Sequence, residues 1–355
     1  MTNIVTDRPM FPHTVDSTIL AALRSCGQKA YRTYLQHWKP KTESVHLVAG
    51  GAFAKGLEVA RKAYFEGLYP LYADFPHHQE GFPPIRKPFG YEQLTPGDAA
   101  GAEAAGLQAL IIAYGDFECP SDSAKSLERT AGALEFYFAN YPLGADGMMP
   151  VRMANGKFGI EFSFAEPLPI NHPVTGMPIL YTGRSDMIAE FAGGIYIVDE
   201  KTTSQLGASW SRQWEMRGQF TGYQWAAAQH GLKAQGSIIR GVSILKTKYD
   251  TQQAITYRTQ AELDRWLTQT VRDIQRLINM WQDNWYDFSM DSACGEYGGC
   301  SLMQICKSSD PETWLPMYFE QKVWDPLNHK SVTVDEWHKS WGHIPGGLST
   351  GNPPV

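Results

Sequence analysis

The sequence predicts a mixed α/β (α+β) fold, with a central mixed sheet that contains an antiparallel meander and is flanked by helices. Two observations carry this prediction. Up to about residue 141, apolar side chains recur mainly at helical spacing. From residue 156 to residue 202, the chain instead alternates or runs in β-branched and aromatic residues, with turn residues between the runs. Helical and strand-like segments then alternate, which completes the pattern of an α/β core.

The individual elements follow from spacing, capping residues and breakers. We expect early helices at 18–38, 52–66, 96–114 and 121–141. We expect three consecutive antiparallel strands at 156–168, 178–191 and 194–202. After them we expect a helix at 210–230, strands at 236–246 and 254–258, and a long helix at 260–283. Asp16 and Ser17 are the predicted N-caps of the first helix. The remaining segments are predicted as an irregular arm (1–15), a long ordered loop or small insertion (67–95), and an extended appendage with a frayed end (307–355).

Composition excludes several classes of protein. The 355 residues are 43% hydrophobic, with 11 Trp, 17 Tyr and 16 Phe, which can fill a sizeable core and argues against disorder. No stretch reaches the roughly 20 apolar residues needed to span a bilayer. The first residues lack the pattern of a signal peptide, so we expect a cytoplasmic protein without a membrane partner.

The net charge of −6 argues against a protein that coats nucleic acid, although a local basic groove would suffice for an enzyme. Candidates for such a groove lie near the motifs described below, and ordinary solvated surface is the alternative for each of them. These candidates are Arg212, Arg217, Lys246 and Lys248.

The segment GRSDMIAEFAGGIYIVDEKTTS, residues 183–204, carries the most chemical information. It places Asp186 and Asp199 on neighbouring antiparallel strands, which can bring both carboxylates to one end of the sheet. Mg²⁺ binds through one or two carboxylates plus water and phosphate oxygens. Lys201 shares the face of Asp199, while Glu200 points the other way and could offer only its backbone carbonyl. The alternative is a set of ordinary ion pairs on an exposed hairpin.

Three motifs, GRSD, VDEKTTS and QFTGYQWAA, together resemble the RecB-like branch of the PD-(D/E)xK nuclease superfamily. The resemblance implies a restriction-endonuclease-like core. It implies that Asp186 and Asp199 hold Mg²⁺ or Mn²⁺ and that Lys201 assists the attacking water. Gln219 and Tyr223 match the family's Q-x-x-x-Y signature on one helix face, where they could contact the scissile strand or brace the lysine.

The first helical motif departs from the family pattern. The family has a histidine in a context such as G-x-x-x-H-x-x-x-E, and the corresponding run here is GAFAKGLE, residues 51–58. Lys55 stands where the histidine is expected. Glu58 is the candidate third metal ligand, with a solvated helix residue as the alternative, and His46 is a weaker substitute for the missing histidine.

Three of the five cysteines cluster in ACGEYGGCSLMQICK, with five residues between Cys294 and Cys300 and five more before Cys306. Thiolates at such spacings can surround one metal centre, and Cys26 is the candidate fourth ligand. The arrangement resembles the iron–sulfur members of the RecB-like group, including AddB-type helicase–nucleases and CRISPR-adaptation nucleases, which implies a [4Fe–4S] cluster. A zinc site and unrelated free thiols, as expected for Cys119, are the alternatives.

These patterns predict a metal-dependent DNA nuclease, in particular an exonuclease acting on single strands or duplex ends. The resemblance places it in phage or mobile-element modules, with replication or recombination proteins as partners. A nuclease-like DNA-binding protein without catalysis is the main alternative, and a redox or metal-sensing protein is the third. We expect an N-terminal helical region with the first-motif helix and the insertion (1–150), a nuclease core (151–290), an iron–sulfur segment (291–310) and an appendage (311–355).

Overall fold

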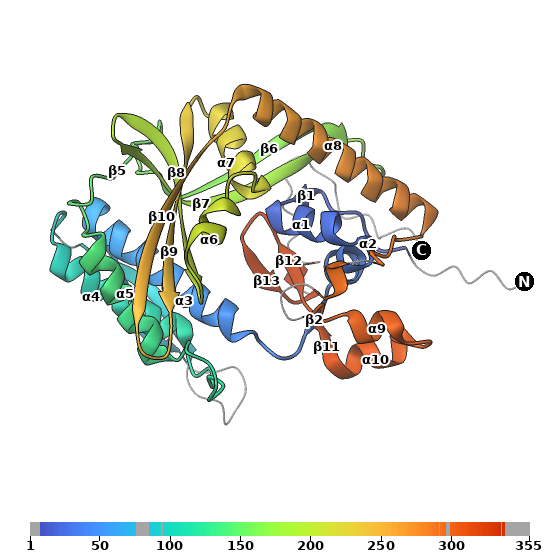
Figure 1. The fold of residues 1–355 in the computed structure, drawn as a ribbon, viewed down its shortest axis with the longest axis horizontal. Coiled ribbons are helices and arrows are strands. Elements are labelled where there is room, and N and C mark those ends of the chain that lie inside the picture. The colour runs from blue at the N-terminus through green and yellow to red at the C-terminus, as the bar shows by residue number, and fades with distance from the viewer. Residues whose placement is uncertain are drawn as a thin grey trace, which may run out of the picture. The chain divides into compact units, whose positions relative to one another are not determined.

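The computed structural model of the chain describes residues 8–75, 85–93, 95–290, 292–295, 299–334 and 336–337. Figure 1 shows the order of its elements along the chain. The chain divides into two compact units. Unit 1 comprises residues 1–42, 163–183 and 264–355, and unit 2 comprises residues 43–162 and 184–263.

A mixed sheet forms the centre of unit 2 and confirms the predicted fold class. Its strands follow the order β7 (Pro178–Phe191), β8 (Gly194–Thr203), β9 (Ala234–Ile244) and β10 (Tyr249–Tyr257). The β7–β8 and β9–β10 pairs are antiparallel, whereas β8 and β9 are parallel. Two further strands, β5 (Met149–Pro150) and β6 (Ile160–Asn171), pair with β7, whose first residues belong to unit 1.

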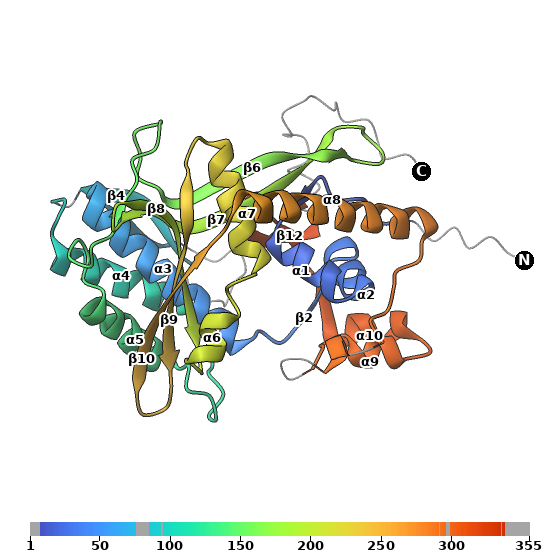
Figure 2. The same cartoon turned by 45° about the horizontal axis from the view of Figure 1, so that its top comes forward.

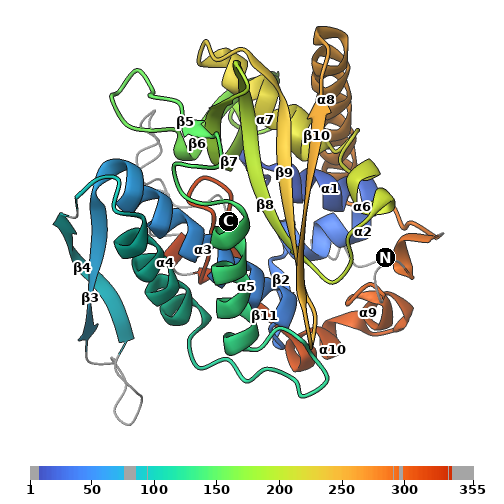
Figure 3. The same ribbon diagram turned by 60° about the vertical axis from the view of Figure 1, so that its left-hand side comes forward.

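Helices cover both faces of this sheet. The helices α3 (Val45–Glu66), α4 (Ala99–Tyr114) and α5 (Leu127–Asn140) gather on one face (Figure 3). Their buried side chains, such as Phe53, Leu134 and Tyr137, pack against Val242 of β9. The other face carries α6 (Ala208–Arg212) and α7 (Gly218–Gln229). Because successive strand residues point to opposite faces, neighbours on β8 face different helices.

Unit 1 is built around α1 (Ser17–Ser25) and α8 (Gln260–Asp283), which lie side by side in Figure 2. Arg24 of α1 forms an ion pair with Asp273 of α8 at 2.7 Å. The predicted cap Asp16 is confirmed, since its carboxylate accepts the N–H groups of residues 18 and 19. Residues 260–263 of α8 belong to unit 2. In addition to the cysteine region described later, unit 1 contains α2 (Gly27–Ala30), a π-helix (Tyr31–Leu35), α10 (Pro311–Tyr318), β1 (Thr14–Val15), β2 (Trp38–Pro40), β11 (Phe319–Gln321), β12 (Val323–Asp325) and β13 (Lys330–Val332).

Two predicted helices are interrupted in the structure. The helix expected at 18–38 breaks at Cys26, whose backbone is extended, with φ −165° and ψ 128°. The break accompanies a contact from far along the chain, because the N–H of Gln28 donates to the carbonyl of Asp287 at 2.9 Å. The helix expected at 210–230 is divided into α6 and α7 by the turn at 213–217.

Two segments predicted as irregular contain regular structure. The segment at 67–95, predicted as a long ordered loop or a small insertion, contains an antiparallel hairpin of β3 (Leu68–Phe75) and β4 (Ile85–Gln93). The proposed appendage contains α10, the pair β12–β13, and β11, which pairs with β2. Its end at 338–355 lies outside the described residues. The four-part division of the chain stays a prediction. Within the described ranges, no helix is both long and apolar enough to cross a membrane.

Candidate active site

Neighbouring strands bring two buried carboxyl groups together in unit 2. Met187 of β7 pairs with Val198 of β8, so Asp186 falls opposite Asp199 one residue further along the ladder. The N–H of Glu200 donates to Asp186 Oδ2 at 2.9 Å. Burial raises the pKa of Asp186 well above its usual value, and the charge of Asp199 raises it further. The two carboxyl groups therefore repel each other in a site where only 2% of Asp199 is exposed.

Lys201 lies beside this pair, and its ammonium forms an ion pair with Asp199. Burial would lower the pKa of Lys201, but the charges of Asp199 and Asp186 raise it above its usual value. The ammonium nitrogen also lies 5.9 Å from the ring centroid of Phe220 on α7. Lys201 therefore supplies a fixed positive charge on the face that α7 covers.

Glu200 points to the opposite face, as the alternation of the strand predicts. Arg61 of α3 contacts both of its carboxylate oxygens, at 2.9 and 2.5 Å, and the hydroxyl of Tyr137 donates to it at 2.9 Å. Arg240 donates to the same hydroxyl at 3.2 Å and to Asp146 at 2.6 Å. The side chain of Glu200 is thus committed to a buried network, and only its backbone can face the carboxyl pair.

The helix α7 places the Q-x-x-x-Y residues next to the carboxyl pair. Gln219 Nε2 donates to the hydroxyl of Tyr223 at 3.1 Å, across one turn of the helix. Only 6% of Tyr223 is exposed. Burial raises the pKa of Tyr223, and the charge of the nearby Asp199 raises it further. The structure therefore gathers Gln219 and Tyr223 around Lys201.

The first-motif residues lie on α3, where Glu58 is held by two lysines. Lys55, at the expected histidine position, contacts one oxygen of Glu58 at 2.9 Å, and Lys62 contacts the other at 2.7 Å. Burial alone would raise the pKa of Glu58, but the two lysines bring it below its usual value. His46 is exposed near the start of the helix, about three turns from Glu58.

Glu161 is a further acidic residue of this region that the sequence did not single out. Its backbone has φ 54°, a left-handed conformation that is rare for glutamate. Burial raises its pKa to about 7, against the effect of Arg184, whose Nε lies 2.8 Å from the carboxylate. Glu58 and Glu161 line the same cavity, and the charge of Glu161 also raises the pKa of Asp186. A single glutamate within a predicted strand belongs to no motif, so nothing in the sequence marks Glu161 as part of this site.

A comparison with models of known families decides the family. The model of the PD-(D/E)XK nuclease superfamily matches residues 18–307, from the first helix to beyond the last cysteine. The chain belongs to the PD-(D/E)XK nuclease superfamily. The match includes every residue named above as part of the site.

The likeness to solved structures is weaker. A protein of Eubacterium rectale, described as a candidate exonuclease, shares 13% identity over 79% of this chain and 87% of its own, with a TM-score of 0.45. The protein SSO0001 shares 11% identity over 43% of this chain and 65% of its own, with a TM-score of 0.25. No curated protein matches the chain.

The residues of this PD-(D/E)XK nuclease fit a metal site with two protein carboxylates better than one with three or more protein ligands. Among the described residues, no group of three or more His, Cys, Asp or Glu side chains is arranged to hold a metal ion. The buried pair Asp186 and Asp199 nevertheless has the donor chemistry of a Mg²⁺ or Mn²⁺ site, which needs only one or two carboxylates. Their raised pKa values are those expected of carboxyl groups that a cation would stabilise in the charged form.

The four predicted cysteine ligands lie together in unit 1, near η2 (Ser292–Cys294) and α9 (Met303–Lys307). Cys26, Cys294, Cys300 and Cys306 line one cavity of about 30 Å³. Burial raises the pKa of Cys306, and the other three cysteines raise it further, which reflects their closeness. All five cysteines are free thiols, and Cys119 belongs to unit 2.

The four candidate groove residues occupy exposed positions in unit 2. Arg212 ends α6 and Arg217 precedes α7, whereas Lys246 and Lys248 belong to the turn between β9 and β10. Their contribution to DNA binding stays a prediction.

Proposed function

We propose that this chain is a Mg²⁺- or Mn²⁺-dependent deoxyribonuclease of the RecB-like branch that hydrolyses phosphodiester bonds from strand ends. The observation that carries the proposal is the position of Lys201, ion-paired with Asp199 and directly beside Asp186. Two buried carboxylates and one ammonium on adjacent strands are what a metal-assisted attack on a phosphate requires.

Each group of the site has a part in the proposed hydrolysis. A metal ion held by Asp186 and Asp199 would lower the pKa of a bound water and polarise the scissile phosphate. The ammonium of Lys201 can donate a hydrogen bond to the attacking water and offset the negative charge that builds on the phosphate. Tyr223, fixed by Gln219, limits the positions that Lys201 can adopt and can donate to a phosphate oxygen.

Glu58 is proposed as an additional metal ligand. Its present contacts would have to change for it to bind a metal ion. Both of its oxygens are engaged by Lys55 and Lys62, so ligation would have to displace at least one ammonium. The backbone carbonyl of Glu200 is the other donor proposed, because its side chain is bound to Arg61.

We further propose that Cys26, Cys294, Cys300 and Cys306 hold a [4Fe–4S] cluster with a structural role. Their convergence on one cavity, from residues that lie more than 260 positions apart in the chain, supports a shared ligand. The cysteine arrangement also supports placement among the iron–sulfur members of the branch, in phage or mobile-element DNA replication and recombination.

A second candidate is a DNA-binding protein that has lost catalysis, favoured by the pairing of Lys55 with Glu58.

A cleavage assay distinguishes the two functions. Protein purified without oxygen would be incubated with end-labelled linear single-stranded, linear duplex and circular DNA. The proposal predicts that Mg²⁺ or Mn²⁺ supports degradation of linear substrates, that circular DNA resists, and that a chelator stops the reaction. Binding without cleavage under every metal condition would favour the inactive alternative.

A further inference from the structure

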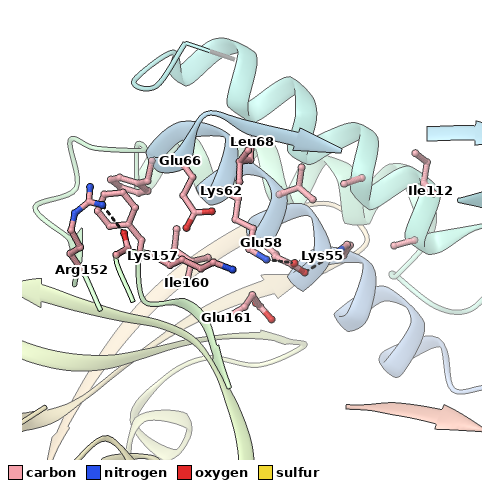
Figure 4. A pocket seen from close by; sticks show the side chains of 16 residues that line it. Lys55, Glu58, Lys62, Glu66, Leu68, Ile112, Arg152, Lys157, Ile160 and Glu161 are labelled. Atoms are coloured by element: carbon pink, nitrogen blue, oxygen red, sulfur yellow. Dashed lines mark hydrogen bonds and ion pairs between the residues drawn. The ribbon is translucent and has the colours of Figure 1, made fainter. Parts of the chain in front are cut away.

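A large cavity in unit 2 adjoins the acidic side chains of the site but contains none of the core motif residues. Its volume is about 930 Å³, and its walls come from α3, the first residue of β3, α4, the 152–158 loop and the start of β6. Figure 4 shows Arg152 and Lys157 at one end and Ile112 at the other, with Glu58 and Glu161 along one side. Sites that enclose small ligands have volumes of about 300–1,000 Å³, so this cavity has room for more than one nucleotide.

Positive charge is concentrated at the loop end of the cavity. Lys55 and Lys62 are engaged with Glu58, so their charges are partly compensated. Arg152 and Lys157 are exposed on the loop. Within the described part of the chain, the ammonium of Lys157 has no ion-pair partner. A phosphate group entering from this end would therefore meet cations that no carboxylate of a described residue contacts.

Flat apolar surface lies next to these cations. Phe158 packs against Phe65, with ring centroids 5.9 Å apart, and the guanidinium of Arg152 lies 4.3 Å from the ring centroid of Phe158. Ile112 and the alanines of α4 complete the apolar wall. Aromatic rings and arginine planes beside cationic side chains bind the bases and phosphates of single strands.

We propose that this cavity binds the unpaired terminal nucleotides of the DNA strand that the enzyme cuts. This inference rests on the proposed nuclease function and adds an end-binding subsite to it. A cavity of about 930 Å³ is roughly 10 Å across in each direction and cannot enclose a duplex, since the major groove alone is about 12 Å wide. Bases pack against Phe158 and the apolar wall, and phosphates contact Lys157 and Arg152.

The position of the cavity explains how a bound end reaches the carboxylates. Glu161 lines the cavity and lies on β6, which pairs with β7, the strand that carries Asp186. The N–H of Ile188 donates to the carbonyl of Gly159 at 2.7 Å, two residues from Asp186 on one strand and from Glu161 on the other. A strand whose end is bound between α4 and the loop leaves past Glu161, so a phosphodiester bond near the end arrives at Asp186 and Asp199. In this proposal the end of the strand occupies the cavity, and a circular strand has no end to occupy it.

The proposal is tested by binding of a fluorescent ten-residue oligothymidylate to the full chain, measured by anisotropy with chelator present so that no cleavage occurs. Phe158→Leu keeps apolar bulk but loses the flat ring, and we expect it to weaken binding about tenfold. Lys157→Ala should reduce the slope of log affinity against log salt by about 0.7, the loss of one phosphate contact. The matched control is Lys233→Ala, an exposed lysine outside the cavity, which should change neither quantity.

Competition distinguishes an end site from a general groove. Linear single-stranded DNA should displace the probe at lower concentration than a circular single strand of the same length. Equal competition, or variants of Lys157 and Phe158 that bind like the Lys233 control, would overturn the proposal. If such variants also cut DNA normally, the nuclease function stands without the subsite. If the wild type binds ends through these residues but never cuts, the subsite stands and the nuclease function fails.

Discussion

Glu200 and Lys201 are adjacent in the chain, yet their side chains lie in different environments. Lys201 joins Asp199 on the face of α7, whereas Glu200 joins Arg61 and Tyr137 on the face of α3. Strand alternation alone predicts this division. The partners of Glu200 connect β8 to the helix that carries Glu58, one turn before Arg61, so the network fixes the distance between the two motifs.

The Arg61–Glu200 pair gives a prediction about stability. Arg61→Ala leaves the buried carboxylate of Glu200 without its cation, which should cost about 3–5 kcal/mol in the free energy of unfolding. Lys62→Ala, its neighbour on α3, removes a part-exposed cation and should cost less than about 1 kcal/mol. Urea unfolding measures both values. Equal losses in the two variants would show that the Arg61 pair does not stabilise the fold, and Arg61→Leu with Glu200→Leu should recover much of the loss.

Among single residues, those that could be predicted as site candidates are the ones that a short stretch of sequence indicates. Asp186, Asp199 and Lys201 were predictable because a strand fixes which neighbours share a face. The prediction of Gln219 and Tyr223 rested mainly on the family resemblance, and helical spacing added only that the two side chains share one face. Glu161 and Arg61 were not predictable, since their partners Arg184 and Glu200 lie 23 and 139 residues further along the chain. Contacts of that kind exist only after the sheet has formed.

At the scale of elements, predicted and observed bounds agree where local sequence signals mark the end of a helix or strand. The strand at 178–191 and the helix at 260–283 were predicted with their observed bounds, because turn residues and periodicity mark their ends. The break at Cys26 carries no such mark, because helical periodicity continues through it. Its extended backbone accompanies a hydrogen bond between Gln28 and Asp287, which no local pattern reveals.

Two glycines of α3 test how closely this helix packs. A Cβ atom on Gly56 would lie 2.7 Å from Leu134 Cδ2 and 2.9 Å from the carbonyl oxygen of Gly106, whereas one on Gly51 would meet nothing within 4 Å. Gly56→Ala should therefore destabilise the protein by about 1–3 kcal/mol. Gly51→Ala should stabilise it by up to about 1 kcal/mol. Thermal unfolding of both variants decides the matter, and a tolerated Gly56→Ala would contradict the close approach of α3 and α4.

The turn between β6 and β7 gives a prediction about pH. His172 Nδ1 accepts the N–H groups of Val174 and Thr175, and its ring stacks on His13 with centroids 3.9 Å apart. Burial and, to a lesser extent, the neighbouring His172 together lower the pKa of His13 to about 4. The unfolded state, with a pKa near 6.5, binds the proton first, so this contribution to stability is complete above pH 6.5 and is lost toward pH 4.

Urea unfolding between pH 7 and pH 4.5 measures this contribution when wild type is compared with His13→Gln. Titration of the carboxyl groups is common to both proteins and cancels in the difference. The stability of the wild type should fall more steeply with decreasing pH than that of the variant. Parallel curves would mean that neutral His13 does not stabilise the turn.

At the scale of the whole molecule, the four cysteines join the first helix to residues 294–306 within unit 1. We expect protein purified without oxygen to be brown and to contain about four iron atoms per chain if it holds the proposed cluster. Cys300→Ser should lose the iron and unfold at lower temperature. Cys119→Ser, which changes the one cysteine outside the group, should keep both properties. Equal iron content in the two variants would refute the assignment of the ligands.

The central claim is that Asp186, Asp199 and Lys201 form the hydrolytic centre of this PD-(D/E)XK nuclease. Its most direct test is cleavage of end-labelled linear DNA by wild type and Lys201→Ala in Mg²⁺ or Mn²⁺, with binding measured in chelator. We predict that the wild type cuts only with metal, and that Lys201→Ala binds DNA with similar affinity but loses cleavage, by at least about a hundredfold. Undiminished cleavage by Lys201→Ala would contradict it.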